Sequence, residues 1–371
     1  MQSVYYIIPT TGIGGAEKRF VELWCYLQQY DKRFDFYLVI HRKLFSDFHA
    51  IPEINKILKP WQSKAIIYDI DMSGPVLRSQ KELYRFICDH TKPADILHFI
   101  LSFPTFIFPL KHGKTIYTLT ESSLQNVNIK GRVLYLLNVC RAKYTDVLDP
   151  GVYQKLKSYF FYKQKRISLT PGSFVDTGIF RPSNEKKENW FVFLGRFFYV
   201  IQVVELLQAV PSVCRSLDKL GIHGYRFFFL GFGQQEEEML SIIKKEEYKG
   251  LPIDIKRTDD PEGILAKSKV IFSLQLRNNY PSKSLLEAMS AGNIPLVTDV
   301  GTTRMIAAPE FSYYVPEHFS ATDISDQLTA ILSLDASSIQ AKMKTAREHV
   351  INNFSINSSA AYYSKLYQKL T

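Results

Sequence analysis

Short apolar runs alternate with amphipathic segments along the chain, and this alternation occurs in two series. The apolar runs are Val4–Pro9, Phe34–Ile40, Ala65–Ile70, Asp95–Ile100 and Lys114–Leu119 in the first series, and Trp190–Gly195, Tyr225–Gly231, Lys269–Gln275 and Ile294–Thr298 in the second. Helical periodicity fills Ala16–Gln29, Leu77–His90, Val203–Leu220, Gln234–Lys245 and Ser284–Ala291. Apolar strands alternating with helices are typical of parallel sheets covered on both faces. The pattern predicts an α/β protein with two doubly wound, Rossmann-like parallel sheets.

The length of 371 residues is too great for one compact domain and sufficient for two. The segment Arg166–Pro182 carries Pro, Gly, Ser and Asp and precedes the second series. We therefore expect one domain at residues 1–168 and a second domain at residues 169–354. Residues 355–371 resemble an amphipathic helix, which we expect to pack back on the first domain. Open sheets bind ligands at the carboxyl ends of their strands, so we expect a cleft site between the domains.

Several classes of protein are excluded by simple features of the chain. The four cysteines lie far apart without a CxxC pair, which favours reduced thiols over a zinc site or a disulfide framework. The most apolar stretch, Ile96–Leu110, is shorter than the ~20 residues of a spanning helix, and the chain opens without the basic start of a secretory signal. These features predict a cytoplasmic protein. Asp259 and Asp260 lie at a predicted helix start, where carboxylates are ordinary caps, so no metal site is expected.

The positive charge is concentrated in the first half of the chain. Residues 1–168 hold 24 Lys and Arg against 14 Asp and Glu, which accounts for the whole net charge of +10. It is densest in Lys130–Arg166, where Tyr and Phe are interleaved. Basic and aromatic side chains together suit an anionic membrane surface. A solvated helix face with its aromatics in the core is the alternative, and no nucleic-acid partner is expected because no known nucleic-acid module is present.

Three loops have residues suited to phosphate. Gly14 and Gly15 stand where a strand turns into a helix, and small residues there let the backbone approach a ligand. Arg196 directly follows a strand, and the next strand ends in Gly231 and Gly233. The segment Asn278–Ile306 reads as a loop, a helix opening at Ser282–Ser284, a strand and a Gly/Thr turn.

The helix start in this last segment is the most informative of the three. Helix amides with Lys283 beside them make an anion site for a diphosphate. Glu287 follows one turn later, where a carboxylate can hold two ribose hydroxyls. A solvated helix Glu is the alternative for this residue taken alone.

The loop GGAEK, the strand end LGR, the GxG turn and YPSKSLLEAMSAG followed by VTDVGTTR resemble glycosyltransferase family 4, the retaining nucleotide-sugar transferases of the GT-B fold. The resemblance implies that Gly14 and Gly15 approach the donor diphosphate and sugar. It implies that Arg196 and the backbone amides of Ser284 and Leu285 bind phosphate, and that Glu287 binds the ribose. The donor-binding set that it implies also contains Asn278, Asn279, Tyr280 and Lys283, and the catalytic set is Arg196, Glu287 and Glu121.

This chain departs from the family pattern at three positions. Ile201 stands where the family has a Lys, and Asn278-Asn279 stand where it has a second Glu. The family's His would fall near Thr120-Glu121. Candidate replacements for the missing cation are Lys283, Arg277 and Arg304. Asn279 remains able to hydrogen-bond a sugar hydroxyl, and Glu121 to contact the acceptor.

The resemblance implies a metal-independent, hexosyltransferase-type enzyme that transfers a sugar, with retention, from a UDP- or GDP-type donor. It implies no cofactor beyond this nucleotide-sugar co-substrate. The expected acceptor is a glycan or a lipid-linked glycan of bacterial cell-surface polysaccharide synthesis, such as capsule, O-antigen or exopolysaccharide, reached from the inner face of the plasma membrane. The alternatives are a GT-B protein that has lost turnover and acts as a binding or scaffold partner, and a relative of nucleotide-sugar epimerases.

Overall fold

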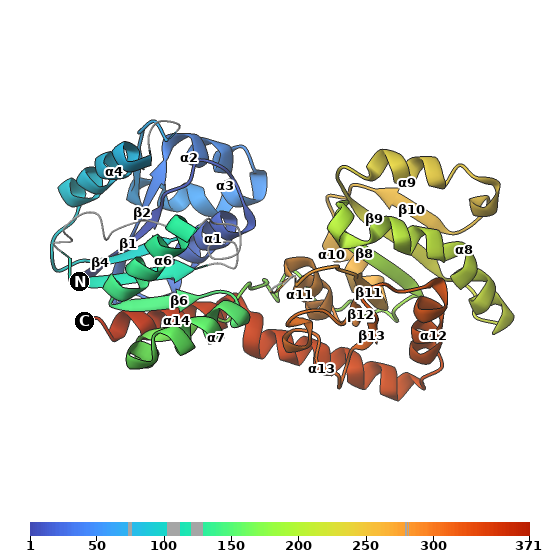
Figure 1. Cartoon of the computed structure of the whole chain (residues 1–371). Helices are drawn as coiled ribbons and strands as arrows, with labels where there is room; N and C mark the ends of the chain where they lie inside the picture. The colour runs from blue at the N-terminus through green and yellow to red at the C-terminus, as the bar shows by residue number, and fades with distance from the viewer. Residues whose placement is uncertain (73–75, 102–111, 120–128, 279, 281) are drawn as a thin grey trace. The chain divides into compact units, whose positions relative to one another are not determined.

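The chain folds into two structural units that do not follow its order exactly. Met1–Gly172 and Ile356–Thr371 form the first unit, and Ser173–Ser355 form the second. A computed structural model describes residues 1–72, 76–101, 112–119, 129–278, 280 and 282–371 (Figure 1). The last helix therefore belongs to the same unit as the first strand.

The first unit is built on a seven-stranded parallel sheet with helices on both faces. Its strands are β1 (Gln2–Ile8), β2 (Phe34–His41), β3 (Ala65–Tyr68), β4 (Ile96–Ile100), β5 (Lys114–Leu119), β6 (Tyr144–Val147) and β7 (Ile167–Leu169). Its helices are α1 (Gly15–Tyr30), α2 (Arg42–His49), α3 (Pro52–Leu58), α4 (Val76–His90), α6 (Ile129–Arg141), α7 (Pro150–Tyr159) and α14 (Ile356–Gln368), with 3-10 turns η1 (Lys59–Lys64) and η3 (Phe161–Arg166).

The second unit is built on a six-stranded parallel sheet. Its strands are β8 (Trp190–Arg196), β9 (Arg226–Phe232), β10 (Ile253–Lys256), β11 (Val270–Ser273), β12 (Ile294–Thr298) and β13 (Tyr313–Val315). Its helices are α8 (Val203–Lys219), α9 (Glu236–Ile242), α10 (Pro261–Lys267), α11 (Lys283–Ser290), α12 (Ala321–Leu332) and α13 (Ala336–Phe354), with 3-10 turns η4 (Tyr199–Ile201), η5 (Glu246–Tyr248) and η6 (Thr303–Met305).

The two sheets have the same winding. The strand orders are β3-β2-β1-β4-β5-β6-β7 and β10-β9-β8-β11-β12-β13, and every described pair is parallel. In each sheet the chain starts at an inner strand, winds outward to one side, and then returns to wind outward on the other. The point of return lies between β1 and β4 in the first sheet and between β8 and β11 in the second. The two doubly wound parallel sheets predicted from the sequence are confirmed.

Both faces of the second sheet are buried, as the continuous apolar strands require. Phe191, Phe193 and Phe227 lie in the core on one side, where α8, α9 and α12 pack. Val192 and Phe228, one residue along each strand, lie in the core on the other side with α10, α11 and α13. Successive residues of a strand point to opposite faces of the sheet. Because both faces are buried here, every position in these strands needs an apolar residue.

Four short strands are absent from the predicted set, namely β6, β7, β10 and β13. Each has three or four residues, and β6 carries Asp146 in its middle. A run this short has too few positions to display a periodicity, and its strand conformation depends on pairing with a longer neighbour. The predicted helix start at Asp260 is confirmed, because its carboxylate accepts a hydrogen bond from the Gly263 amide at 2.8 Å.

The last helix, α14, is held on the first sheet by a buried carboxylate. The two oxygens of Asp146 accept hydrogen bonds from the hydroxyls of Tyr362 and Tyr363, both at 2.6 Å. Thr118 on β5 donates to the same carboxylate at 3.2 Å. Burial raises the pKa of Asp146. These three hydroxyls provide the donors that a buried carboxylate needs, and two of them come from α14, so the helix stabilises the sheet on which it packs.

A buried histidine extends this network. His98 on β4 lies 2.7 Å from the Thr118 hydroxyl through Nε2 and 2.9 Å from the Tyr367 hydroxyl through Nδ1. Burial lowers the His98 pKa to about 3, and the nearby Arg19 charge acts in the same direction. Burial thus favours the neutral imidazole, and its Nε2 contact joins it to Thr118, which in turn donates to Asp146.

The depressed pKa of His98 predicts a specific dependence of stability on pH. Unfolded His titrates near 6.5, so below that pH the unfolded chain binds a proton that the folded chain does not. The contribution of His98 to stability is therefore complete above pH 6.5 and is lost as the pH falls toward 3. Between pH 6.5 and 5 we expect a loss of roughly 2 kcal/mol from this residue.

His98→Gln keeps hydrogen-bonding groups at this position and removes the titration. Its free energy of unfolding, measured with denaturant at pH 5 and 6.5, is expected to fall less on acidification than that of the wild type. Equal pH dependence in the two proteins would contradict the assignment of a neutral buried imidazole. Asp146 is present in both proteins, so its own titration affects them alike.

Candidate functional site

The candidate site lies at the carboxyl ends of the strands in the second sheet, around the point where the strand order reverses. Arg196 ends β8, and the segment Gln275–Asn278 follows β11, the strand paired with β8. In open α/β sheets ligands bind outside the strand ends at this reversal. Hydrogen bonds hold the loops together there: the Leu276 amide donates to the Val200 carbonyl at 3.0 Å, and the Thr298 hydroxyl bonds to both the amide and the carbonyl of Gln275.

Arg196 is exposed, and its guanidinium carbon lies 5.9 Å from the centre of the Phe198 ring. Two glycines at the end of β9 allow its backbone to lie close to the end of β8. A Cβ on Gly231 would lie 1.8 Å from the Gly195 carbonyl oxygen, and one on Gly233 would lie 2.6 Å from the Phe197 carbonyl oxygen. These glycines are required because the ends of β8 and β9 approach too closely for any side chain. The GxG turn thus has a structural role at the end of β8, where Arg196 lies.

The start of α11 provides the second part of the site. Ser282 is the N-cap residue, and its side chain makes no capping hydrogen bond within the described part of the chain. The amides of the first helical turn have no acceptors inside a helix, and the helix dipole adds partial positive charge there. Lys283 is exposed and Ser284 half-buried, whereas the Leu285 side chain is buried in the core and anchors the helix. Glu287 is half-buried one turn later.

The polar loop before α11 is tied to the turn after β12. The Asn278 side-chain oxygen accepts hydrogen bonds from the Thr302 amide at 3.1 Å and from its hydroxyl at 2.9 Å. A Cβ on Gly301, which has a φ of 55°, would lie 2.6 Å from the Asn278 Cβ. Tyr280 packs against the core of the second unit. Asn279, the proposed sugar contact, lies outside the described residues.

The candidate cations differ in what surrounds them. Arg304 forms two hydrogen bonds with Asp299, at 2.9 and 2.7 Å, and stacks on the Tyr314 ring at 4.4 Å. The Arg304 side chain lowers the pKa of the Asp299 carboxyl, so the charge of Arg304 is largely compensated. Arg277 and Lys283 are exposed. Arg304 is therefore balanced by its own carboxylate, Asp299.

Ile201, at the position of the family's Lys, is partly buried and packs against the core of the second unit. The next residue, Gln202, is buried and has a left-handed backbone with φ 33° and ψ 35° directly before α8. A side chain other than glycine in this conformation is uncommon and is frequently found near functional sites. No sequence pattern indicated this feature, because Gln is not a residue type that favours positive φ.

In the first unit, the loop after β1 leads directly into α1. Gly14 is the N-cap, and a Cβ on Gly15 would meet none of the described atoms within 4 Å. A Cβ on Gly14 would lie 2.5 Å from a carboxylate oxygen of Glu17, whose carboxylate also accepts a hydrogen bond from Thr10 at 3.0 Å. Glu17 was not among the predicted site residues, and its carboxylate brings negative charge close to Gly14. Glu121, the predicted acceptor contact, lies outside the described residues.

The second unit has a clear likeness to known proteins. Residues 176–349 match the family model described as Glycosyl transferases group 1. The match includes Arg196, the start of α11 and Glu287. No curated protein sequence matches the chain significantly.

Several solved structures share the fold of this chain. A glycosyltransferase from Rickettsia africae ESF-5 aligns with a TM-score of 0.75 and 15% identity, over 100% of this chain and 98% of that one. Alr3699/HepE from Anabaena, solved with UDP and glucose, aligns with 0.70 and 10% over 100% of both chains. A TarM variant from S. aureus, solved with fondaparinux, alpha-GlcNAc-glycerol and UDP, aligns with 0.66 and 12% over 99% and 100%. The fold is GT-B.

The assignment of Arg196 and Glu287 predicts the effect of removing each side chain. We expect Arg196→Ala and Glu287→Ala each to weaken binding of UDP or GDP, whichever binds, by at least about tenfold, or ~1.4 kcal/mol, because each removes a charged hydrogen-bonding group. Isothermal titration calorimetry measures this change. Arg226→Ala, at the amino end of β9, and Glu238→Ala, on α9, are the matched controls and are expected to bind like the wild type. Equal affinity in all five proteins would refute the site.

Proposed function

We propose that this protein is a glycosyltransferase that uses a nucleotide-diphosphate sugar as donor. The observation that carries the proposal is that Arg196 ends β8 and α11 follows β11, the strand paired with β8, at the reversal point of the second sheet. A guanidinium and the first-turn amides of a helix at one strand edge suit a diphosphate. The match of residues 176–349 to group 1 glycosyl transferases supports the same donor class.

The chemistry follows from what the leaving group needs. When the sugar leaves, negative charge develops on the diphosphate, and preorganised cations and amides stabilise that charge. Arg196 and the amides of Ser284 and Leu285 would supply this stabilisation, with Glu287 holding the ribose hydroxyls. The resemblance to family 4 favours transfer with retention and without a bound metal. In HepE and TarM the ligands include UDP, which supports a UDP-type donor here.

For the acceptor we propose a glycan or a lipid-linked glycan of cell-surface polysaccharide synthesis. This acceptor class is supported by the exposed basic and aromatic side chains of α7 and η3 in the first unit and by the resemblance to family 4. Packing of Ile201 against the core favours a second candidate. With the usual cation replaced by an apolar residue, the protein would bind a nucleotide sugar and act as a binding or scaffold partner with weak turnover.

A donor screen distinguishes these candidates. We expect one UDP- or GDP-sugar to stabilise the purified protein against thermal unfolding, by about 2.7 kcal/mol at a concentration ~100 times the dissociation constant. An active transferase will also hydrolyse that donor slowly, and Arg196→Ala will reduce the rate. Binding without any hydrolysis or transfer would favour the scaffold. No stabilisation by any nucleotide sugar would contradict both.

We further propose that the protein is cytoplasmic and docks on an anionic membrane through α7 and η3. None of the helices in the described ranges has the length and apolar character to span a bilayer. On this segment the side chains of Tyr159, Phe161 and Tyr162 are exposed, Phe161 by 74%. Lys155, Lys165 and Arg166 are exposed beside them. Exposed aromatics next to cations suit the headgroup region of a bilayer, where each cation contributes ~1 kcal/mol.

Only some of the basic and aromatic side chains in and around this docking segment, α7 and η3, are exposed. Phe160 is buried in the core of the first unit, and Tyr135, Tyr144 and Tyr153 are half-buried. The Lys163 ammonium donates to the Cys140 carbonyl, and the Lys157 ammonium lies 5.2 Å from the Tyr153 ring centre. Because these two ammonium groups have contacts within the chain, Lys157 and Lys163 are kept unchanged in the test variant. The side chains of Lys130 and Arg132 lie outside the described residues.

Sedimentation with lipid vesicles tests the docking segment. We expect the protein to bind anionic vesicles and not neutral ones at 0.1 M salt, and to be released at 1 M, where the Debye length falls from about 10 Å to about 3 Å. The variant with Lys155, Lys165 and Arg166 changed to Gln is expected to lose binding. The control variant has Lys219, Lys244 and Lys245 of the second unit changed to Gln. It has the same net charge as the test variant and should bind like the wild type. Wild-type protein that stays unbound at low salt would exclude membrane docking.

A further inference from the structure

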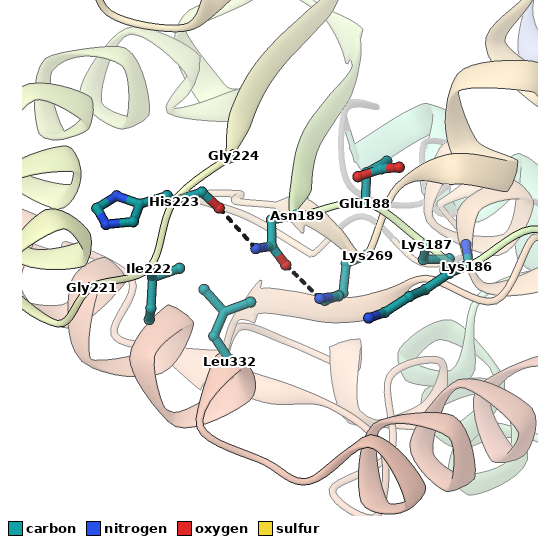
Figure 2. Close-up of a pocket in the computed structure, with 10 residues that line it drawn as sticks. All are labelled: Lys186, Lys187, Glu188, Asn189, Gly221, Ile222, His223, Gly224, Lys269 and Leu332. Carbon is teal, nitrogen blue, oxygen red and sulfur yellow. Dashed lines mark hydrogen bonds between the residues drawn. The ribbon is translucent and has the colours of Figure 1, made fainter.

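The second unit has a pocket of about 480 Å³ at the edge of the sheet opposite the candidate site. Its lining comes from the segments that precede three strands: residues 186–189 precede β8, residues 221–224 precede β9, and Lys269 precedes β11. Because these strands are parallel, their amino ends lie at one edge and their carboxyl ends at the other. Figure 2 shows the lining side chains. The volume is in the range of small-molecule sites.

Lys269 is held in place at this edge. Its amide donates to the Trp190 carbonyl at 3.0 Å, and its carbonyl accepts from the Ile294 amide at 2.8 Å. Its ammonium donates to the side-chain oxygen of Asn189, whose amide nitrogen donates to the His223 carbonyl at 3.3 Å. The two dashed lines in Figure 2 mark this chain. Both the backbone and the charged end of Lys269 are therefore fixed.

Positive charge dominates the pocket. Burial lowers the pKa of Lys269, and the Lys186 ammonium lowers it further. Lys187 also lines the pocket, but its side-chain nitrogen donates to the carbonyls of Leu265 at 3.0 Å and Ser268 at 2.7 Å. Burial lowers the pKa of Lys187 to about 7, so it adds only part of a positive charge at neutral pH.

Two other titratable groups line the pocket, Glu188 and the exposed His223. Glu188 favours the charged form of Lys269, but Figure 2 shows its carboxylate turned away from that ammonium. Like charges held together at a partly buried position cost free energy, and a bound anion offsets that cost.

The rest of the pocket is apolar. Ile222, from the turn before β9, and Leu332, the last residue of α12, line it with Lys269. Both are half-buried and pack against the core of the second unit. A ligand that fits both parts has an anionic group for the lysines and an apolar portion for Ile222 and Leu332.

We propose that this pocket binds a phosphate dianion, either free or carried by a small ester whose apolar part lies against Ile222 and Leu332. The phosphate oxygens accept hydrogen bonds from the ammonium groups of Lys186 and Lys269. Asn189 is a positioning residue, because it orients the Lys269 ammonium. The site is separate from Arg196 and α11, so its occupant is neither the donor nor the acceptor of the proposed transfer, and its existence does not depend on that function.

Calorimetric titration of the full chain with inorganic phosphate and with phenyl phosphate tests this site. The ionic strength is kept constant with chloride, and no nucleotide is present. We expect the wild type to bind at least one of the two probes. Lys186→Gln is expected to weaken that binding about tenfold, because it removes one charged donor at an exposed position. Lys245→Gln, an exposed lysine elsewhere in the same unit, is the matched control and is expected to bind like the wild type.

The two probes identify the source of the phosphate. Tighter binding of phenyl phosphate, lost in Leu332→Ala while inorganic phosphate is unaffected, supports an ester. Equal binding of both, unaffected by Leu332→Ala, supports the site with free phosphate as its occupant. Absence of binding of both probes to the wild type overturns the proposal, and so does binding that Arg196→Ala removes and Lys186→Gln leaves unchanged.

Discussion

The first unit depends on a carboxylate that has no access to water. Asp146 lies on β6, near one side of the seven-stranded sheet, and receives the hydroxyls of Tyr362 and Tyr363 from the last helix. Leaving such a group without donors costs about 1–3 kcal/mol or more for each missing hydrogen bond. The network is therefore more than an addition to an apolar core. It requires that α14 lie on this sheet, and so assigns Ile356–Thr371 to the first unit.

The second sheet separates two kinds of chemistry by strand direction. Since all its strands are parallel, every loop that follows a strand lies at one edge and every loop that precedes a strand lies at the other. The first edge has Arg196 and the start of α11, and the second has Lys186 and Lys269. The same buried strands thus position two groups of cations at opposite edges of the sheet. These strands are buried in an apolar core on each face of the sheet.

The sequence allows the long strands and the fold class to be predicted because fully buried parallel strands are continuous apolar runs. It does not reveal β10 or β13, which need a neighbouring strand to become extended. For the site, Arg196 and Ser282 were recognisable because each stands beside a strand or helix end. The contact between Asn278 and Thr302 was not, because 24 residues separate them and only the folded sheet brings them together. The role of Gly231 was also hidden, since the Gly195 backbone that it accommodates lies on another strand.

The place of α14 has a consequence for the order in which the molecule is made. The strands of the first unit leave the ribosome first, yet the side chains that satisfy Asp146 and His98 belong to residues 362–367, close to the end of the chain. During synthesis of the whole second unit, the nascent first sheet carries a carboxylate and an imidazole without their final partners. The half of the protein that is translated first is consequently the half that is completed last. Without residues 362–367, Asp146 and His98 would lose these partners within the core of the first unit.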